Sequence, residues 1–117
     1  MALKIVANPT FPGHADITVA GQDALERIKL TWRHKTAEQM CEWFEANKAR
    51  PAIDGLMEII ADCPDLTDAD GQPVPFSREV LQTTVANYPP ATGELVTAWL
   101  AQLTESRTKN LKALPAG

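Results

Sequence analysis

The stretch RIKLTWR at residues 27–33 decides the fold that we predict for this chain. Its apolar residues alternate with basic and hydroxyl residues, and a period of two is typical of a strand with one buried face. The run ADITV at residues 15–19 alternates in the same way, and GQD at residues 21–23 supplies turn-forming residues between the two runs. Together they predict an antiparallel hairpin at residues 14–34 whose exposed face is basic.

The sequence after the hairpin has the periodicity of amphipathic helices. Thr36 and Gln39 match a capping box, in which each side chain accepts a hydrogen bond from a free amide of the other residue, and they predict a first helix to about Lys48. Three further helices are predicted at about residues 51–62, from the N-cap Ser77 to the proline break at residues 88–90, and at about residues 90–109. Residues 63–75 are rich in Pro, Asp and Gly and predict a surface loop.

These elements define the predicted fold class and domain organisation. With 117 residues, of which 44% are apolar, the chain is long enough for one core and short for two. We predict an α+β fold that is mainly α, with an N-terminal antiparallel hairpin followed by about four packed helices. The single domain, 1–117, is expected to comprise an extended arm at 1–13, the hairpin at 14–34, a helical part at 36–110 and a flexible tail at 111–117.

Charge and cysteine content make several kinds of partner improbable. The net charge is −4, and no run of Lys and Arg matches a phosphate backbone, so nucleic acid is not an expected partner. Cys41 and Cys63 lack the CxxC spacing of zinc and redox sites, and both are expected to be idle thiols. Since no stretch approaches the roughly 20 apolar residues that cross a bilayer, no membrane contact is expected.

Catalytic and metal-binding motifs have little support in the sequence. His14, Asp16 and His34 are residue types that bind metals or move protons, and they are the basis of a hypothetical metal-dependent hydrolase. No HExxH spacing, nucleophile motif or phosphate-binding glycine loop accompanies them. Histidines at strand ends with an ordinary structural role are the better interpretation. We therefore expect neither catalytic residues nor a cofactor or metal.

Aromatic residues are the remaining candidates for function, because they supply binding hot spots as well as core packing. Trp43 and Trp99 lie on the apolar stripes of predicted helices, so packing is a sufficient explanation for each. Phe44 follows Trp43, and Tyr88 stands at the proline break. We take Trp43, Phe44, Tyr88 and Trp99 as the candidate partner-binding residues.

Three segments of the chain resemble one protein family. The first is PTF at residues 9–11 with KLTWRHKT at 29–36, and the second is the acidic loop that closes on PFS at 75–77. The third is NYP at 87–89, followed by AWL at 98–100 and TKN at 108–110. In this order they resemble the tail assembly chaperones of long-tailed phages and prophages. The sequence departs from the family's pattern at residues 62–64, where DCP stands in place of an aromatic residue.

The resemblance implies a non-enzymatic protein of the bacterial cytoplasm that is absent from the mature virion. It implies two partners, the tape measure protein and the tail tube protein. It also implies a possible homo-oligomer. The main alternative is a structural tail component, such as a tube or joining protein, since the small size and hairpin suit both. The small metal-dependent hydrolase that would use His14, Asp16 and His34 is the third hypothesis.

Overall fold

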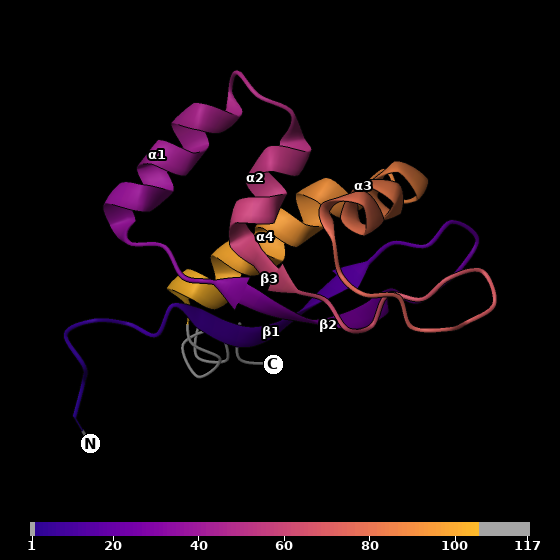
Figure 1. The fold of residues 1–117 in the computed structure, drawn as a ribbon, viewed down its shortest axis with the longest axis horizontal. Helices are drawn as coiled ribbons and strands as arrows, with labels where there is room; N and C mark the ends of the chain where they lie inside the picture. Colours follow the sequence, from indigo (N-terminus) through magenta and orange to yellow (C-terminus); the bar gives the residue numbers. More distant parts are fainter. Residues whose placement is uncertain (1, 106–117) are drawn as a thin grey trace, which may run out of the picture.

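The computed structural model describes residues 2–105, and in this part of the chain a small sheet is covered by helices. Its elements are, in chain order, β1 (Thr10–Ile17), β2 (Glu26–Arg33), α1 (Ala37–Asn47), α2 (Ala52–Ile59), β3 (Ile60–Asp62), α3 (Arg78–Asn87) and α4 (Ala91–Thr104). The strands form one antiparallel sheet in the order β1-β2-β3, and the helices gather on one side of it (Figure 1). The predicted α+β class, a hairpin followed by four helices, is confirmed.

The hairpin has the faces that its alternating sequence predicts. β1 and β2 pair over their full length, with Phe11 opposite Trp32 and Asp16 opposite Arg27. Trp32 is fully buried beneath the helices, whereas Arg27 and Lys29 are exposed on the opposite face. The exposed face of the sheet is therefore basic, as expected.

β1 begins earlier than predicted, at Thr10, so the expected extended arm at 1–13 is wrong for its last four residues. Proline normally opposes strand formation because it has no amide hydrogen. However, the amide of His14 donates to Gln102 Oε1 at 3.0 Å and not to β2. Pro12, two residues earlier, faces the same way, so its missing amide removes no bond between the strands.

β3 is not among the predicted elements, because the sequence predicts a helix over residues 51–62. In the structure α2 ends at Ile59, and Ile60 lies opposite Trp32 while Asp62 lies opposite Thr31, with a bulge between the two pairs. Ile59 and Ile60 are both fully buried. Over so few residues, adjacent apolar β-branched residues fit the period of a helix and that of a strand equally well. Pairing with the free edge of β2 makes this segment a strand.

The predicted helix starts are confirmed, and the end of α4, like that of α2, comes earlier than predicted. The Thr36 hydroxyl accepts from the Gln39 amide at 3.2 Å, and the Gln39 side chain accepts from the Thr36 amide at 2.9 Å. Ser77 Oγ likewise accepts from the amide of Val80 at 3.2 Å. α4 ends at Thr104 and not near Lys109, because Glu105 has an extended backbone. The predicted tail at 111–117 lies outside the described residues.

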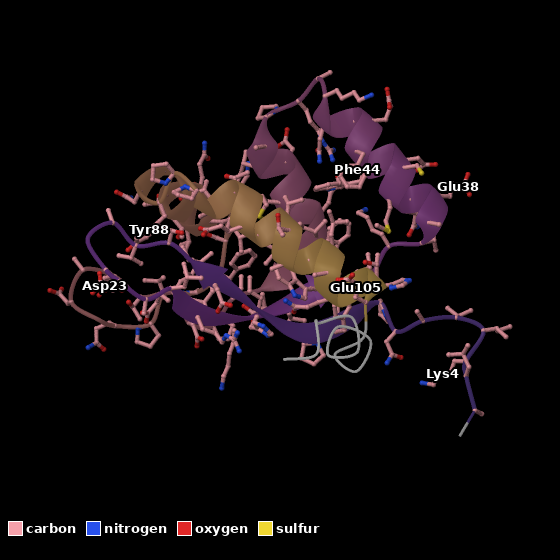
Figure 2. All side chains as sticks on the ribbon, turned by 180° about the vertical axis from the view of Figure 1, so that it is seen from behind. Lys4, Asp23, Glu38, Phe44, Tyr88 and Glu105 are labelled. Carbon is pink, nitrogen blue, oxygen red and sulfur yellow. The ribbon has the colours of Figure 1, made fainter. Side chains whose placement is uncertain are left out.

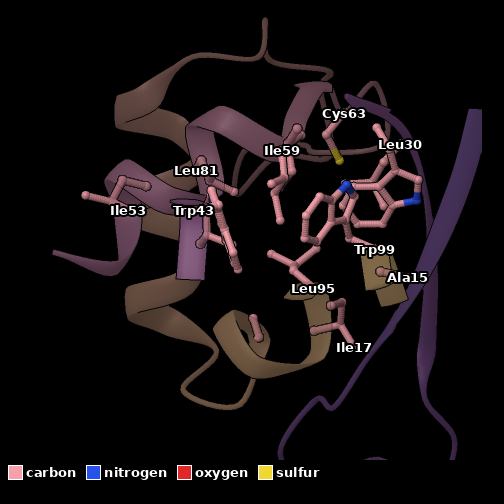
Figure 3. Close-up of a cluster of buried hydrophobic side chains, with 14 residues drawn as sticks. Ala15, Ile17, Leu30, Trp43, Ile53, Ile59, Cys63, Leu81, Leu95 and Trp99 are labelled. Carbon is pink, nitrogen blue, oxygen red and sulfur yellow. The ribbon is translucent and has the colours of Figure 1, made fainter. Parts of the chain in front are cut away.

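One apolar cluster receives residues from all of the described elements (Figure 3). Its largest members are Trp32, Trp43 and Trp99, which are between 0% and 4% exposed. Each indole nitrogen donates a hydrogen bond: Trp32 to Gln102 Oε1 at 2.8 Å, Trp43 to the Gly55 carbonyl at 2.9 Å and Trp99 to the Arg33 carbonyl at 3.0 Å. Burial of three indoles is thus achieved without leaving a polar group unpaired.

α4 closes the outer edge of β1. Gln102 accepts from the His14 amide and also donates to the His14 carbonyl at 2.7 Å, as a neighbouring strand would. At the other end of the strand, Glu94 accepts from the amide of Thr18 at 3.0 Å and from its hydroxyl at 2.6 Å. Unpaired strand edges attract other chains, so these two side chains protect the sheet from being extended at this edge.

Candidate functional site

The four candidate aromatic residues fall into a buried and an exposed pair. Trp43 and Trp99 are 4% and 0% exposed, and their ring centroids are 5.1 Å apart in the core. Phe44 and Tyr88 are 44% and 36% exposed. The structure therefore gives the two tryptophans a packing role and leaves Phe44 and Tyr88 available to a partner.

The two exposed aromatic residues do not belong to one surface. Phe44 is on α1, where its ring meets Trp43 edge-on with centroids 5.0 Å apart. Tyr88 lies at the other end of the molecule, the end that also carries Asp23 in the hairpin turn (Figure 2). A site that includes both residues would have to extend across the molecule, so each is considered with its own surroundings.

Tyr88 is placed by the proline break that follows it. A residue before proline disfavours helical backbone angles, and Tyr88 has φ −123° and ψ 85°. α3 therefore ends at Asn87, and the Tyr88 carbonyl accepts from the amide of Ala91 at 2.8 Å, which turns the chain into α4. The tyrosine side chain is held at the elbow between the two helices.

Tyr88 lines a groove of about 690 Å³ at the turn end of the hairpin. One wall is the end of β1 with the start of β2, another is the loop at residues 63–75, and the third is the C-terminal end of α3. The residues that line this groove are Ile17, Val19, Gln22, Glu26, Arg27, Ile28, Pro64, Asp65, Leu66, Thr67, Pro73, Thr84 and Tyr88. Apolar and polar side chains both contribute to its surface.

The loop at residues 63–75 forms one wall of the groove because hydrogen bonds fold it back on itself and attach it to the sheet. Within the loop, the Val74 amide donates to the Leu66 carbonyl at 3.1 Å. Asp65 Oδ2 accepts from the Lys29 amide at 2.8 Å, beside the end of β3. The sequence predicts a surface loop here but not that the loop faces the hairpin, because the hydrogen bond that holds it goes to the main-chain amide of Lys29.

Acidic groups predominate around the groove. The turn at residues 18–25 contains Asp23 and no Lys or Arg, and the loop at residues 63–75 contains three aspartates and no Lys or Arg. Glu26 and Asp65 line the groove together with a single basic residue, Arg27. That residue is already paired with Asp16, at 2.8 Å between Nε and Oδ1, and this hydrogen bond holds the pKa of Asp16 below its usual value.

The arm at residues 2–9 is a second exposed apolar region. Leu3 and Ile5 are almost completely exposed, and Val6 is 73% exposed. Figure 2 shows Lys4 of this arm at a distance from Tyr88, on the far side of the molecule. Clustered exposed apolar side chains are typical of surfaces that another protein covers.

The residues considered for catalysis are not assembled into a site. Among residues 2–105 no group of three His, Cys, Asp or Glu side chains is arranged to hold a metal ion. His14 and Asp16 share the outer face of β1, where Asp16 is bonded to Arg27, and the His34 amide donates to the Pro9 carbonyl at 2.9 Å. Cys41 is exposed, whereas burial raises the pKa of the Cys63 thiol to about 11.

Fold and groove together define a small α+β protein whose described part has a partly apolar groove. In the same part of the chain, no helix has the length and apolar character that crossing a membrane requires. The chain belongs to the phage tail assembly chaperone family, which it matches over residues 1–110. Comparisons with curated proteins and with solved structures give no match.

Proposed function

We propose that this protein binds the tape measure protein during tail assembly and assists the tail tube protein to assemble around it. Membership of the tail assembly chaperone family is the observation that carries this proposal. We further propose that it acts without catalysis in the cytoplasm of the bacterial host, for a phage or prophage, and is not retained in the mature virion.

The exposed surfaces supply a physical basis for the binding step. A tape measure protein is long, and its apolar helical surface needs cover until the tube surrounds it. The groove beside Tyr88 and the arm with Leu3 and Ile5 are apolar surfaces that no described residue covers. Neither surface includes Trp32, Trp43 or Trp99, so a partner can bind there without contacting the buried indoles.

Capture of the tape measure protein tests the proposal directly. The full chain, carrying an affinity tag, is coexpressed with the tape measure and tube proteins encoded beside it, and the captured proteins are identified by mass spectrometry. We expect the tape measure protein to be recovered, and Tyr88→Ala to reduce its affinity about tenfold if Tyr88 is a hot spot. Phe44→Ala is the matched variant, because it removes the other exposed aromatic ring. Absence of the tape measure protein from the captured material would contradict the proposal.

Composition of the virion distinguishes a chaperone from a structural tail component. We expect no peptides of this protein in purified virions, together with defective tails when its gene is deleted. Abundant peptides in the virion would favour the structural alternative, and normal tails without the gene would rule out an assembly role.

A further inference from the structure

We infer that the groove beside Tyr88 selects a partner segment in which apolar side chains are flanked by Lys or Arg. This inference deepens the proposed function, since it rests on a protein partner occupying this surface. It concerns the chemistry of the segment and not the identity of the protein that carries it.

The charge around the groove favours a basic segment. The turn at residues 18–25 and the loop at residues 63–75 contain acidic residues and no Lys or Arg. Glu26 lines the groove, is exposed, and makes no ion pair with any residue of the described chain. Glu26 and Asp65 outnumber the one basic lining residue, Arg27, whose charge is already opposed by Asp16 at 2.8 Å, so acidic charge is in excess at the groove. A basic segment is therefore attracted, and an acidic one is repelled.

The surface between these charges favours an apolar side chain. Ile28 and Leu66 are half-buried, with the rest of each side chain open to the groove, and Tyr88 is 36% exposed. Over residues 2–105 the one buried side-chain nitrogen or oxygen without a partner is Arg50 Nη2, which does not line the groove. No buried polar group therefore awaits a polar small molecule in the groove, whereas an apolar side chain would cover Leu66 and Tyr88.

Two matched peptides test the selectivity of the groove. One is a fluorescent helical peptide with leucine on one face and lysine on the other, and its counterpart has glutamate in place of every lysine. Binding of each to the full chain is measured by fluorescence anisotropy at two salt concentrations. We expect the lysine peptide to bind more tightly, by an amount that falls as salt increases.

Substitutions locate the binding surface. Glu26→Lys is expected to weaken binding of the lysine peptide roughly fivefold, the scale of one exposed ion pair. Asp70→Lys, on the loop, provides an independent change of the same kind, and circular dichroism checks that each variant is folded. The control is Glu42→Lys, an equal change of charge on α1 at an exposed position without an ion pair in the described part. Tyr88→Ala should weaken binding at both salt concentrations, since its contribution is apolar.

Several outcomes would overturn the inference. Equal binding of the two peptides would remove the charge preference, and an equal effect of Glu42→Lys and Glu26→Lys would show attraction to the net charge of the whole protein. Backbone amide NMR shifts confined to α1 or to the arm would place the peptide elsewhere. The proposed function is tested separately. If the tape measure protein is captured equally well by the Glu26→Lys variant, only this inference is contradicted. If the peptide binds the groove but the tape measure protein is not captured, only the proposed partner is contradicted.

Discussion

The aromatic core and the groove contain side chains of similar chemistry, yet the molecule treats them in opposite ways. In the core, Trp99 is fully buried and its indole nitrogen donates to the Arg33 carbonyl, so both its apolar body and its polar atom are satisfied within the chain. In the groove, Tyr88 is positioned by backbone hydrogen bonds at the end of α3, and it stays 36% exposed. The difference teaches that similar aromatic side chains can be either part of the core or part of an open surface, depending on where the chain places them.

Truncation of a core tryptophan is expected to have the largest effect. Trp99→Ala removes a fully buried indole and leaves the Arg33 carbonyl without its donor, so the free energy of unfolding should fall by roughly 3–5 kcal/mol. Urea denaturation followed by far-ultraviolet circular dichroism measures this loss. A fall of less than about 1 kcal/mol would show that the core tolerates the cavity, and the distinction between the two regions would fail.

Loss of the side chain that closes β1 should have the next largest effect. Gln102→Ala leaves the indole nitrogen of the buried Trp32 and both main-chain groups of His14 without their partner, which should cost roughly 1–3 kcal/mol. The same denaturation assay applies, with Gln82→Ala on the exposed face of α3 as the control. Equal stabilities for the two variants would contradict the role given to Gln102.

Truncation of the groove aromatic should scarcely change stability. Tyr88→Ala removes a partly exposed ring from a helix end, and we expect the free energy of unfolding to change by no more than about 0.5 kcal/mol. Together with a loss of partner affinity, this result would make the comparison with Trp99 complete. A loss as large as that of Trp99→Ala would instead show that Tyr88 belongs to the core.

The two thiols give a further contrast of core and surface. Cys41 is exposed and should be alkylated at mildly alkaline pH, whereas Cys63 is buried with its pKa raised to about 11 and should react only after unfolding. Mass spectrometry of native and unfolded protein should find one and two modified cysteines, respectively. Because the pKa of Cys63 is higher in the folded than in the unfolded chain, its contribution to stability is complete below pH 9.0 and is lost as the pH rises toward 11. Ready alkylation of native Cys63 would contradict this assignment.

Local patterns predicted most of the fold, and long-range contacts explain what they missed. The alternation around Trp32, the Thr36–Gln39 box and the Ser77 cap depend on neighbours in the sequence, and all three are confirmed. The strand at residues 60–62 depends on a partner almost thirty residues away, and so could not be distinguished from a helix end. The early start of β1 depends on pairing with the end of β2, where Thr10 lies opposite Arg33 more than twenty residues along the chain.

The candidate site was less predictable than the fold for the same reason. The proline break points to Tyr88 as a candidate. Periodicity cannot distinguish an inner from an outer apolar face, so it also makes the buried Trp43 and Trp99 candidates for partner binding. The groove itself depends on the bond between Asp65 and the Lys29 amide, which involves no side chain on β2. No pattern in the residues of either segment predicts such a bond.

Because both ends of the 63–75 loop are anchored, its exposed residues can be replaced without loss of the hydrogen bonds that hold it. It leaves the sheet after β3 and re-enters the helical layer at the Ser77 cap, and both ends are fixed by hydrogen bonds of their own. Substitutions at its exposed positions would alter the charge of one groove wall, whereas Cys63 and Leu66 must be kept because they pack in or against the tryptophan core. The loop is therefore a segment in which exposed side chains of the groove wall can change while the hydrogen bonds at its two ends are kept.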